Sequence, residues 1–195
     1  MIATQLRLTR PDCKALKISD AYSIHRVVYD LFPGDFRDFL FVDKGGDFNA
    51  RKILILSERK PEMPPYGIIE SKRVPENLLE HDYYGFEVTL NPTKRDKQTG
   101  KTTAIRGREN LLKWFLEKAP SLGFVINSES LELRHSGVQT FNIGNGKTVT
   151  HNSATFVGKL KVADRDKFKT SFRKGIGRAK GFGFGLFQII PLQIQ

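Results

Sequence analysis

The sequence predicts an α+β fold of two tandem ferredoxin-like (βαββαβ) domains, with a β-hairpin inserted in the second. Short apolar or alternating segments, typical of strands, are separated by a few amphipathic helices. Their order reads β-α-β-β-(short)-β and then β-α-β-β-α-β. Hydrophobic residues make up 39% of the chain, which is enough for a packed core. We expect a first domain of residues 1–80 and a second domain of residues 81–195.

The elements of the first domain follow from periodicity and turn residues. An alternating strand from Ile2 to Leu8 precedes a helix from about Asp20 to Phe32, whose apolar residues recur at spacings of three and four. Two apolar strands, Phe36 to Val42 and Lys52 to Ser57, are joined by a glycine turn. A short strand around Gly67 to Ser71 completes the unit, in which the second helix has only a weak signal.

The second domain begins with the alternating strand Tyr83 to Leu90. A charged loop from Lys94 to Lys101 follows, which we expect to be mobile, and then a helix from about Gly107 to Ala119. Gly144-Asn145-Gly146, between two strands, is a hairpin signal. The remaining predicted elements are the strands Phe124 to Ile126, Leu131 to Arg134, Val138 to Ile143, Lys147 to His151 and Ala154 to Val162, the helix Asp164 to Arg173, and the strand Phe182 to Ile190, with Phe182 and Phe184 in its core.

Positive charge is concentrated in the second half of the chain. The formal net charge is +11, yet residues 1–93 carry −1 and residues 94–195 carry +12. Two stretches, Lys94 to Arg108 and Asp164 to Lys180, supply most of it. Such a distribution indicates a polyanionic partner held by the second half, although a basic surface that only aids solubility would look the same.

Several classes of protein and site are disfavoured by composition. A single cysteine, Cys13, excludes an internal disulfide and a multi-cysteine zinc site, and the histidines lack HExxH spacing. Apolar runs such as Ile53 to Leu56 are too short to span a bilayer. We therefore expect a cytoplasmic protein with no cofactor, no metal and no membrane partner.

Residues Gly175 to Gly185 form a glycine-rich segment after the last helix. Its glycines let the backbone approach a phosphate closely, and basic residues add charge at the same point; glycines that permit close packing beneath a helix are the alternative. A dinucleotide-binding loop needs the order strand, glycines, helix, which is reversed here. The segment contains Gly175, Gly177, Gly181, Gly183 and Gly185, with Arg178 and Lys180 between them and Arg173 and Lys174 before it.

Four ordered stretches resemble the CRISPR repeat-processing endoribonucleases, most closely the CasE subfamily that serves type I-E Cascade. The longest match is the C-terminal run from Lys174 to Leu186. The others are Tyr22-Ser23-Ile24-His25-Arg26 with Leu31-Phe32-Pro33, then Arg37 to Phe41, and Phe86 to Thr93. Together they span nearly the whole chain, and the family's pair of ferredoxin-like domains agrees with the predicted element order.

Tyr22, His25 and Tyr29 form a stripe beside the apolar face of the first helix, within about 60° of one another. A histidine at the edge of an apolar face can be purely structural. The resemblance implies catalytic roles for His25 and Tyr22, in cleavage 3′ of the repeat stem-loop by attack of a ribose 2′-hydroxyl. A histidine suits the proton transfer that this needs, as base or as acid, because the unperturbed pKa of an imidazole is about 6.5.

The resemblance also implies that the partners are the repeat stem-loop, the mature guide RNA and other Cascade-type subunits. The basic residues expected to hold this RNA are Arg26, Lys94, Arg95, Lys101, Arg106, Lys147, Arg173, Lys174, Arg178 and Lys180. A passive RNA-binding or guide-capping protein is the main alternative. A metal-dependent nuclease using Asp164 and Asp166 is less favoured, because both carboxylates stand at a helix start and would cap its N–H groups.

Overall fold

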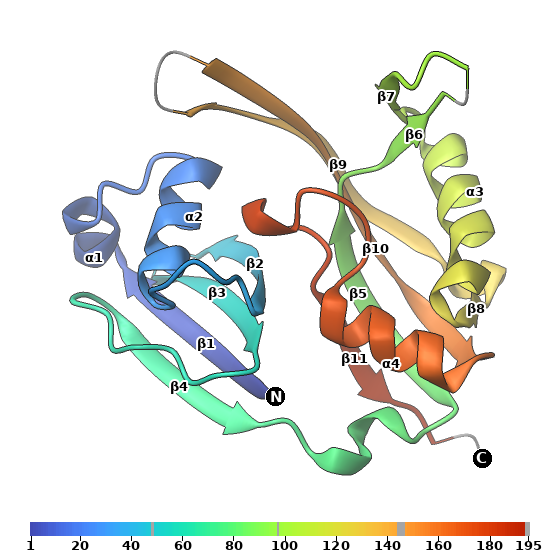
Figure 1. The fold of residues 1–195 in the computed structure, drawn as a ribbon, viewed down its shortest axis with the longest axis horizontal. Coiled ribbons are helices and arrows are strands. Elements are labelled where there is room, and N and C mark those ends of the chain that lie inside the picture. The colour runs from blue at the N-terminus through green and yellow to red at the C-terminus, as the bar shows by residue number, and fades with distance from the viewer. Residues whose placement is uncertain (48, 97, 144–146, 194–195) are drawn as a thin grey trace.

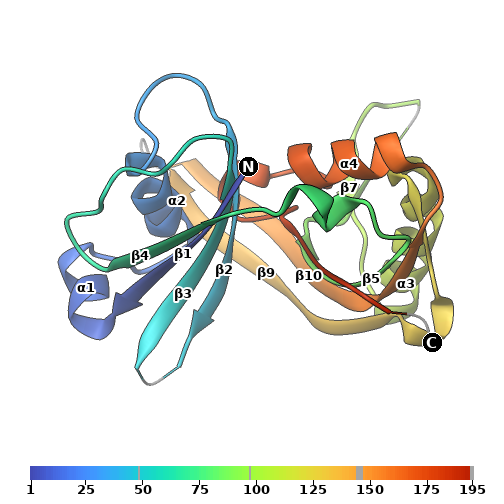
Figure 2. The same ribbon diagram turned by 90° about the horizontal axis from the view of Figure 1, so that it is seen from below.

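The computed structural model describes residues 1–47, 49–96, 98–143 and 147–193, which form two antiparallel sheets (Figures 1 and 2). The first sheet has the strand order β2-β3-β1-β4. The second has the order β11-β5-β10-β8, and β9 also pairs with β10. In each sheet the first and third strands of the unit are central, as the predicted ferredoxin-like fold requires. No helix within the described ranges is long and apolar enough to cross a membrane.

The first sheet carries α2 on one face. Asp20 starts this helix, because its carboxylate accepts a hydrogen bond from the backbone N–H of Ser23. The elements are β1 (Ile2–Thr9), α1 (Arg10–Ala15), α2 (Ala21–Asp30), β2 (Phe39–Gly46), β3 (Ala50–Ser57), β4 (Ile68–Arg73) and the 3₁₀ turn η1 (Glu76–Leu79). The short helix α1 was not predicted, and between β3 and β4 the described chain forms no second helix, in line with its weak signal.

The second sheet carries α3 and α4 (Figure 1). Phe86, Val88 and Leu90 alternate toward these helices, as the sequence pattern predicts. The elements are β5 (Tyr83–Leu90), β6 (Thr93–Arg95), β7 (Thr102–Ala104), α3 (Arg108–Lys118), η2 (Ala119–Leu122), β8 (Phe124–Ile126), η3 (Ser128–Ser130), β9 (Glu132–Ile143), β10 (Lys147–Val162), α4 (Arg165–Lys174), η4 (Lys180–Phe182) and β11 (Phe187–Pro191).

The inserted hairpin is longer than the sequence predicts. The four strands predicted between Leu131 and Val162 form only two longer strands, β9 and β10. These stay paired from Lys147 opposite Ile143 to Val157 opposite Glu132. The pairing contains a register shift between Thr155 and Phe156, which it absorbs without ending the strand. The predicted turn at residues 144–146 lies outside the described residues.

One strand was predicted to start too early. The strand expected from Phe182 begins only at Phe187, because residues 180–182 form a 3₁₀ turn. Phe184 is buried but lies outside the strand, and Phe182 is half-buried. The stretch from Lys94 to Lys101, expected as a mobile loop, starts within β6, whose residues Thr93–Arg95 pair with Thr102–Ala104 of β7. Its mobility stays a prediction.

Strand β2 is apolar on both faces because it belongs to two cores. Phe39 and Phe41 pack with the core beneath α2. Leu40 and Val42 point the other way and join the core of the second sheet. A strand buried on both sides reads as a continuous apolar run, as residues 39–42 do. The two sheets are therefore packed together; the boundary at residue 80 stays a prediction.

Candidate active site and nucleic-acid interface

The catalytic candidates on helix α2 lie beside the buried face of the helix. Ile24 and Val28 are buried in the core of the first sheet. Tyr22, His25 and Tyr29 occupy the neighbouring stripe and are half-buried. The predicted arrangement of the stripe is present, with ring centroids 5.5 Å apart for Tyr22 and His25 and 4.0 Å apart for His25 and Tyr29.

A hydrogen bond joins His25 to the glycine-rich segment. Nδ1 of His25 lies 2.7 Å from the backbone carbonyl oxygen of Gly181, 156 positions along the chain. Because a carbonyl oxygen only accepts, Nδ1 must be the nitrogen that carries the proton. Neutral His25 then has its lone pair on Nε2, and charged His25 has a transferable proton there.

The rings around His25 form an aromatic cluster drawn from three separate parts of the chain. Phe182 stacks on His25 with centroids 5.0 Å apart, and Phe141 of β9 lies 5.0 Å from Phe182 and 6.3 Å from Tyr22. The members of the cluster are Tyr22, His25, Tyr29, Phe141, His151 and Phe182. Its packing fixes the imidazole of His25 between α2 and the glycine-rich segment.

His151 belongs to this cluster, although the sequence favours His25 over it. Its ring lies 5.3 Å from that of Phe182, and Nδ2 of Asn91 lies 3.2 Å from its Nδ1. Its Nε2 is buried without a hydrogen-bond partner among the described residues. Burial lowers the pKa of His151, since the charged imidazolium would lose its hydration. No local sequence signal identifies this residue, because β10 is brought to α2 only by the long hairpin.

Lys180, the residue before Gly181, lies close enough to Arg37 and Lys174 to be affected by their charges. Nζ of Lys180 donates a hydrogen bond to the backbone carbonyl of Lys174 at 2.7 Å. Burial lowers the pKa of Lys180, and the positive charges of Arg37 and Lys174 lower it further. An anion placed here would relieve this repulsion. Arg37 was not among the predicted RNA-binding residues; the motif Arg37-Asp38-Phe39 was its only signal.

The five glycines of the segment Gly175 to Gly185 have different structural roles. A Cβ on Gly185 would lie 2.3 Å from the backbone oxygen of Ile176, and one on Gly175 would lie 2.7 Å from the Leu40 side chain. A Cβ on Gly183 would lie 3.2 Å from the ring of Phe41. These close contacts fit the packing alternative. Gly177 has a positive φ of 79°, and Gly181 faces the Tyr29 hydroxyl beside His25.

The other predicted RNA-binding residues do not all gather at His25. Arg26 is exposed on α2, with its guanidinium 5.8 Å from the centroid of the Tyr22 ring. Arg173 is exposed near the end of α4. Lys147 begins β10 on the long hairpin, at the end that reaches over α2 (Figure 1).

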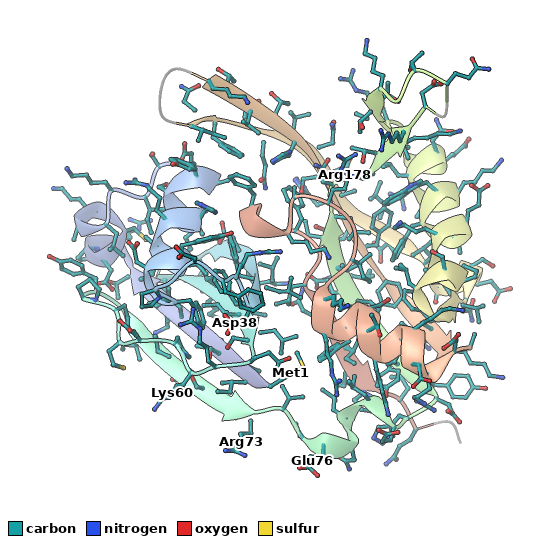
Figure 3. All side chains as sticks on the ribbon, in the orientation of Figure 1. Met1, Asp38, Lys60, Arg73, Glu76 and Arg178 are labelled. Carbon is teal, nitrogen blue, oxygen red and sulfur yellow. The ribbon has the colours of Figure 1, made fainter. Side chains whose placement is uncertain are left out.

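A second group of predicted cations surrounds β6 and β7, on the side of the molecule away from α2. Lys94, Arg95, Lys101 and Arg106 are exposed there. Arg178 connects this region with the glycine-rich segment, since its Nη1 donates to the hydroxyl of Thr102 at 3.0 Å (Figure 3). The structure thus divides the predicted RNA-binding residues between two regions.

Asp164 caps α4 as predicted, since its carboxylate accepts from the backbone N–H of Lys167 at 3.0 Å. The same carboxylate forms an ion pair with the Lys167 ammonium at 2.8 Å. No group of three or more His, Cys, Asp or Glu side chains within the described ranges is arranged to hold a metal ion.

Comparison with known proteins gives consistent results. The model of the family described as "CRISPR associated protein" matches residues 1–191. The chain is 28% identical to the CRISPR system Cascade subunit CasE of Escherichia coli K12, over 89% of this chain and 93% of that protein. It is 26% identical to the CRISPR-associated endoribonuclease Cse3 of Thermus thermophilus, over 54% of each chain.

Solved structures share the fold. CRISPR endoribonuclease Cse3 bound to a 19 nt RNA superimposes with a TM-score of 0.84 at 20% identity, covering 98% of this chain and 100% of that chain. Cas6e from Escherichia coli K-12 gives a TM-score of 0.67 at 21% identity over the same shares. The predicted α+β fold with ferredoxin-like domains is therefore confirmed.

Proposed function

Because this chain belongs to the family of CRISPR associated proteins, we propose that it is an endoribonuclease that cuts precursor CRISPR RNA within the repeat, 3′ of the stem-loop. The observation that carries the proposal is the hydrogen bond from His25 to Gly181, next to the cations Lys174, Lys180 and Arg37. A group suited to proton transfer thus lies beside a basic segment suited to binding an anion. Relatives named as an endoribonuclease and as a Cascade subunit support the same function.

In the proposed reaction the nucleophile is the ribose 2′-hydroxyl that precedes the scissile phosphate. The 2′-oxygen forms a bond to phosphorus, the bond from phosphorus to the 5′-oxygen breaks, and the 2′-hydroxyl proton leaves while the 5′-oxygen gains one. The products are a 2′,3′-cyclic phosphate and a 5′-hydroxyl. His25 transfers a proton through Nε2, since Nδ1 is bound to the Gly181 carbonyl. Tyr22 orients the phosphate, and Lys180 with Arg26 offsets its growing charge.

The mature guide RNA stays bound after cleavage, and the protein joins other Cascade-type subunits. This part of the proposal rests on the relative that is named as a Cascade subunit. A chain carrying +12 in its second half favours retention of a polyanionic product. A passive guide-capping protein would retain RNA equally well, but it would have no need of an imidazole oriented by a distant carbonyl.

The test is incubation of the full chain with candidate repeat hairpins in EDTA, followed by chemical analysis of the RNA ends. We expect a cyclic phosphate and a 5′-hydroxyl. A hairpin with 2′-deoxyribose before the scissile phosphate should bind and remain uncut. Products with a 5′-phosphate, or cleavage of the deoxy hairpin, would exclude the mechanism; binding without any cleavage would favour the passive alternative.

A further inference from the structure

We propose that a groove between β7 and α3 binds a single-stranded segment of RNA, with one base stacked on Trp114. The groove has a volume of about 580 Å³ and is lined on its polar side by Lys94, Arg106, Asn110 and Lys113. This inference rests on the proposed function, because it takes RNA as the ligand. It concerns a region that His25 does not reach, since α2 and α3 lie at opposite ends of the molecule in both ribbon views (Figures 1 and 2).

Trp114 is suited to act as a fixed stacking surface. Its side chain is half-buried, with its ring centroid 6.3 Å from those of both Phe115 and Phe156 in the core. The Lys118 ammonium lies 6.0 Å from the centroid of the indole. A ring held in this way loses little conformational freedom when a base stacks on it. Aromatic side chains on which unpaired bases stack are a recurring feature of single-strand-binding sites.

The charge of the groove matches a phosphate backbone. Lys94, Arg106 and Lys113 line it and are exposed. Within the described ranges, none of the three is in an ion pair. Glu117 is the acidic residue that lines the same groove. With three cations against one carboxylate in its lining, the groove keeps an excess of positive charge, which attracts phosphates and releases counterions when they bind.

The shape and position of the groove favour a single strand over a duplex. Bases of an RNA duplex are stacked inside it and cannot reach a ring that lines a hollow, whereas unpaired bases can. Arg106 also lines an adjacent hollow of about 350 Å³ that extends to Val138 of β9. The bond from Arg178 to Thr102 joins the hairpin of β6 and β7 to the glycine-rich segment. Arg178 therefore places a cation where the glycine-rich segment meets the hairpin of β6 and β7, on the side of the molecule that holds the groove.

The chain has one tryptophan, so its emission reports on this groove alone. We would titrate the full chain carrying His25→Ala with an unstructured RNA of about ten nucleotides, a length within the usual site size. Binding should quench the emission. The double variant Arg106→Gln/Lys113→Gln should bind more weakly, with a salt slope reduced by about 1.4, or 0.7 for each lost phosphate contact. Lys72→Gln, on β4, removes a charge elsewhere and should change little.

A second measurement follows labelled RNA by anisotropy. Trp114→Leu should weaken binding about 5- to 150-fold, the range for loss of one base–aromatic stack, and Trp114→Phe should weaken it less. A repeat hairpin with an unpaired extension on its 5′ or its 3′ side should bind more tightly than a blunt hairpin. The extension that raises the affinity identifies which single-stranded segment binds the groove.

Three results would overturn the proposal: no quenching, unchanged binding by both Trp114→Leu and the double variant, or equal quenching by polyglutamate, which would indicate an acidic peptide ligand. Because the short RNA has no stem and the variant lacks His25, these results are independent of whether the chain cleaves repeat RNA.

Discussion

His25 is the residue on which the proposed chemistry depends most. Replacing it with alanine removes the Nε2 group and should lower the rate of repeat cleavage about 10²- to 10⁴-fold, the usual cost of losing a general acid or base. Affinity for the repeat hairpin should change little, because the imidazole is not among the basic residues that hold the RNA. Single-turnover cleavage and filter binding measure the two effects separately; cleavage at the wild-type rate would refute the assignment.

The role of His25 as base or acid can be separated with a modified substrate. A hairpin whose 5′-bridging oxygen is replaced by sulfur has a leaving group that departs without a proton. If His25 is the acid, the His25→Ala variant should cleave this hairpin almost as fast as the wild-type protein does. If His25 is the base, the defect should persist, because the 2′-hydroxyl still has to lose its proton.

His151 makes the stability of the protein depend on pH. Its pKa is lowered by burial, so the folded protein resists the protonation that the unfolded chain accepts near pH 6.5. The stabilising contribution is therefore present above about pH 6.5 and is lost as the pH falls through the folded pKa. Urea unfolding should show a steeper decline in unfolding free energy between pH 7 and pH 5 for the wild-type protein than for His151→Phe. His135→Gln, at an exposed position of β9, is the matched control.

Among the elements, the turn η4 is tied to α2 through Gly181. A Cβ at this position would lie 2.9 Å from the Tyr29 hydroxyl, and the backbone there does not require glycine by its φ angle. Gly181→Ala should therefore move the turn away from α2 and weaken the hydrogen bond that orients His25. Misplacing a catalytic group by about 1 Å can cost up to about 100-fold in rate, so we expect a loss of cleavage within that range.

The double variant Tyr29→Phe/Gly181→Ala supplies the control for this steric argument. Removing the hydroxyl makes room for the new methyl group, so cleavage should recover much of the loss caused by Gly181→Ala. Tyr29→Phe alone should cleave at close to the wild-type rate. A loss in Gly181→Ala that the second substitution leaves unchanged would mean that this glycine acts otherwise, for example by admitting a phosphate.

At the scale of the whole molecule, Glu87 links the two sheets. Its carboxylate is 23% exposed, pairs with Lys44 of β2 and lies 3.1 Å from the Arg134 guanidinium of β9. Glu87→Gln should leave two cations facing each other across the contact and destabilise the protein by about 1 kcal/mol, the upper end for partly exposed pairs. Thermal unfolding should then occur about 2–4 °C lower.

Glu132→Gln, at an exposed position of β9, should leave the unfolding temperature unchanged and serves as the matched control. Cleavage at 25 °C should be preserved in both variants, because Glu87 touches neither His25 nor the glycine-rich segment. An unfolding temperature that is equally high in Glu87→Gln would show that these ion pairs contribute nothing measurable to the contact between the sheets.

Much of the fold could be predicted from the sequence because it is encoded locally. The spacing on α2, the alternation of β5 and the order of the predicted elements are all short-range patterns, and each agrees with the structure. The predicted breaks in the long hairpin were local patterns overruled by pairing. Strands β9 and β10 continue through residues that read as interruptions, because each strand supplies hydrogen-bond partners to the other.

By itself, the sequence determined the ferredoxin-like order, the basic second half and the stripe of Tyr22, His25 and Tyr29. Only the tertiary structure decided what surrounds that stripe. Gly181 accepts a hydrogen bond from His25 although it lies 156 positions away in the sequence, and Phe141 and His151 belong to a hairpin of the other sheet. Periodicity reports which face of an element is buried but not which distant element covers it. Contacts between remote segments depend on how the two sheets pack, and local sequence patterns do not predict that packing.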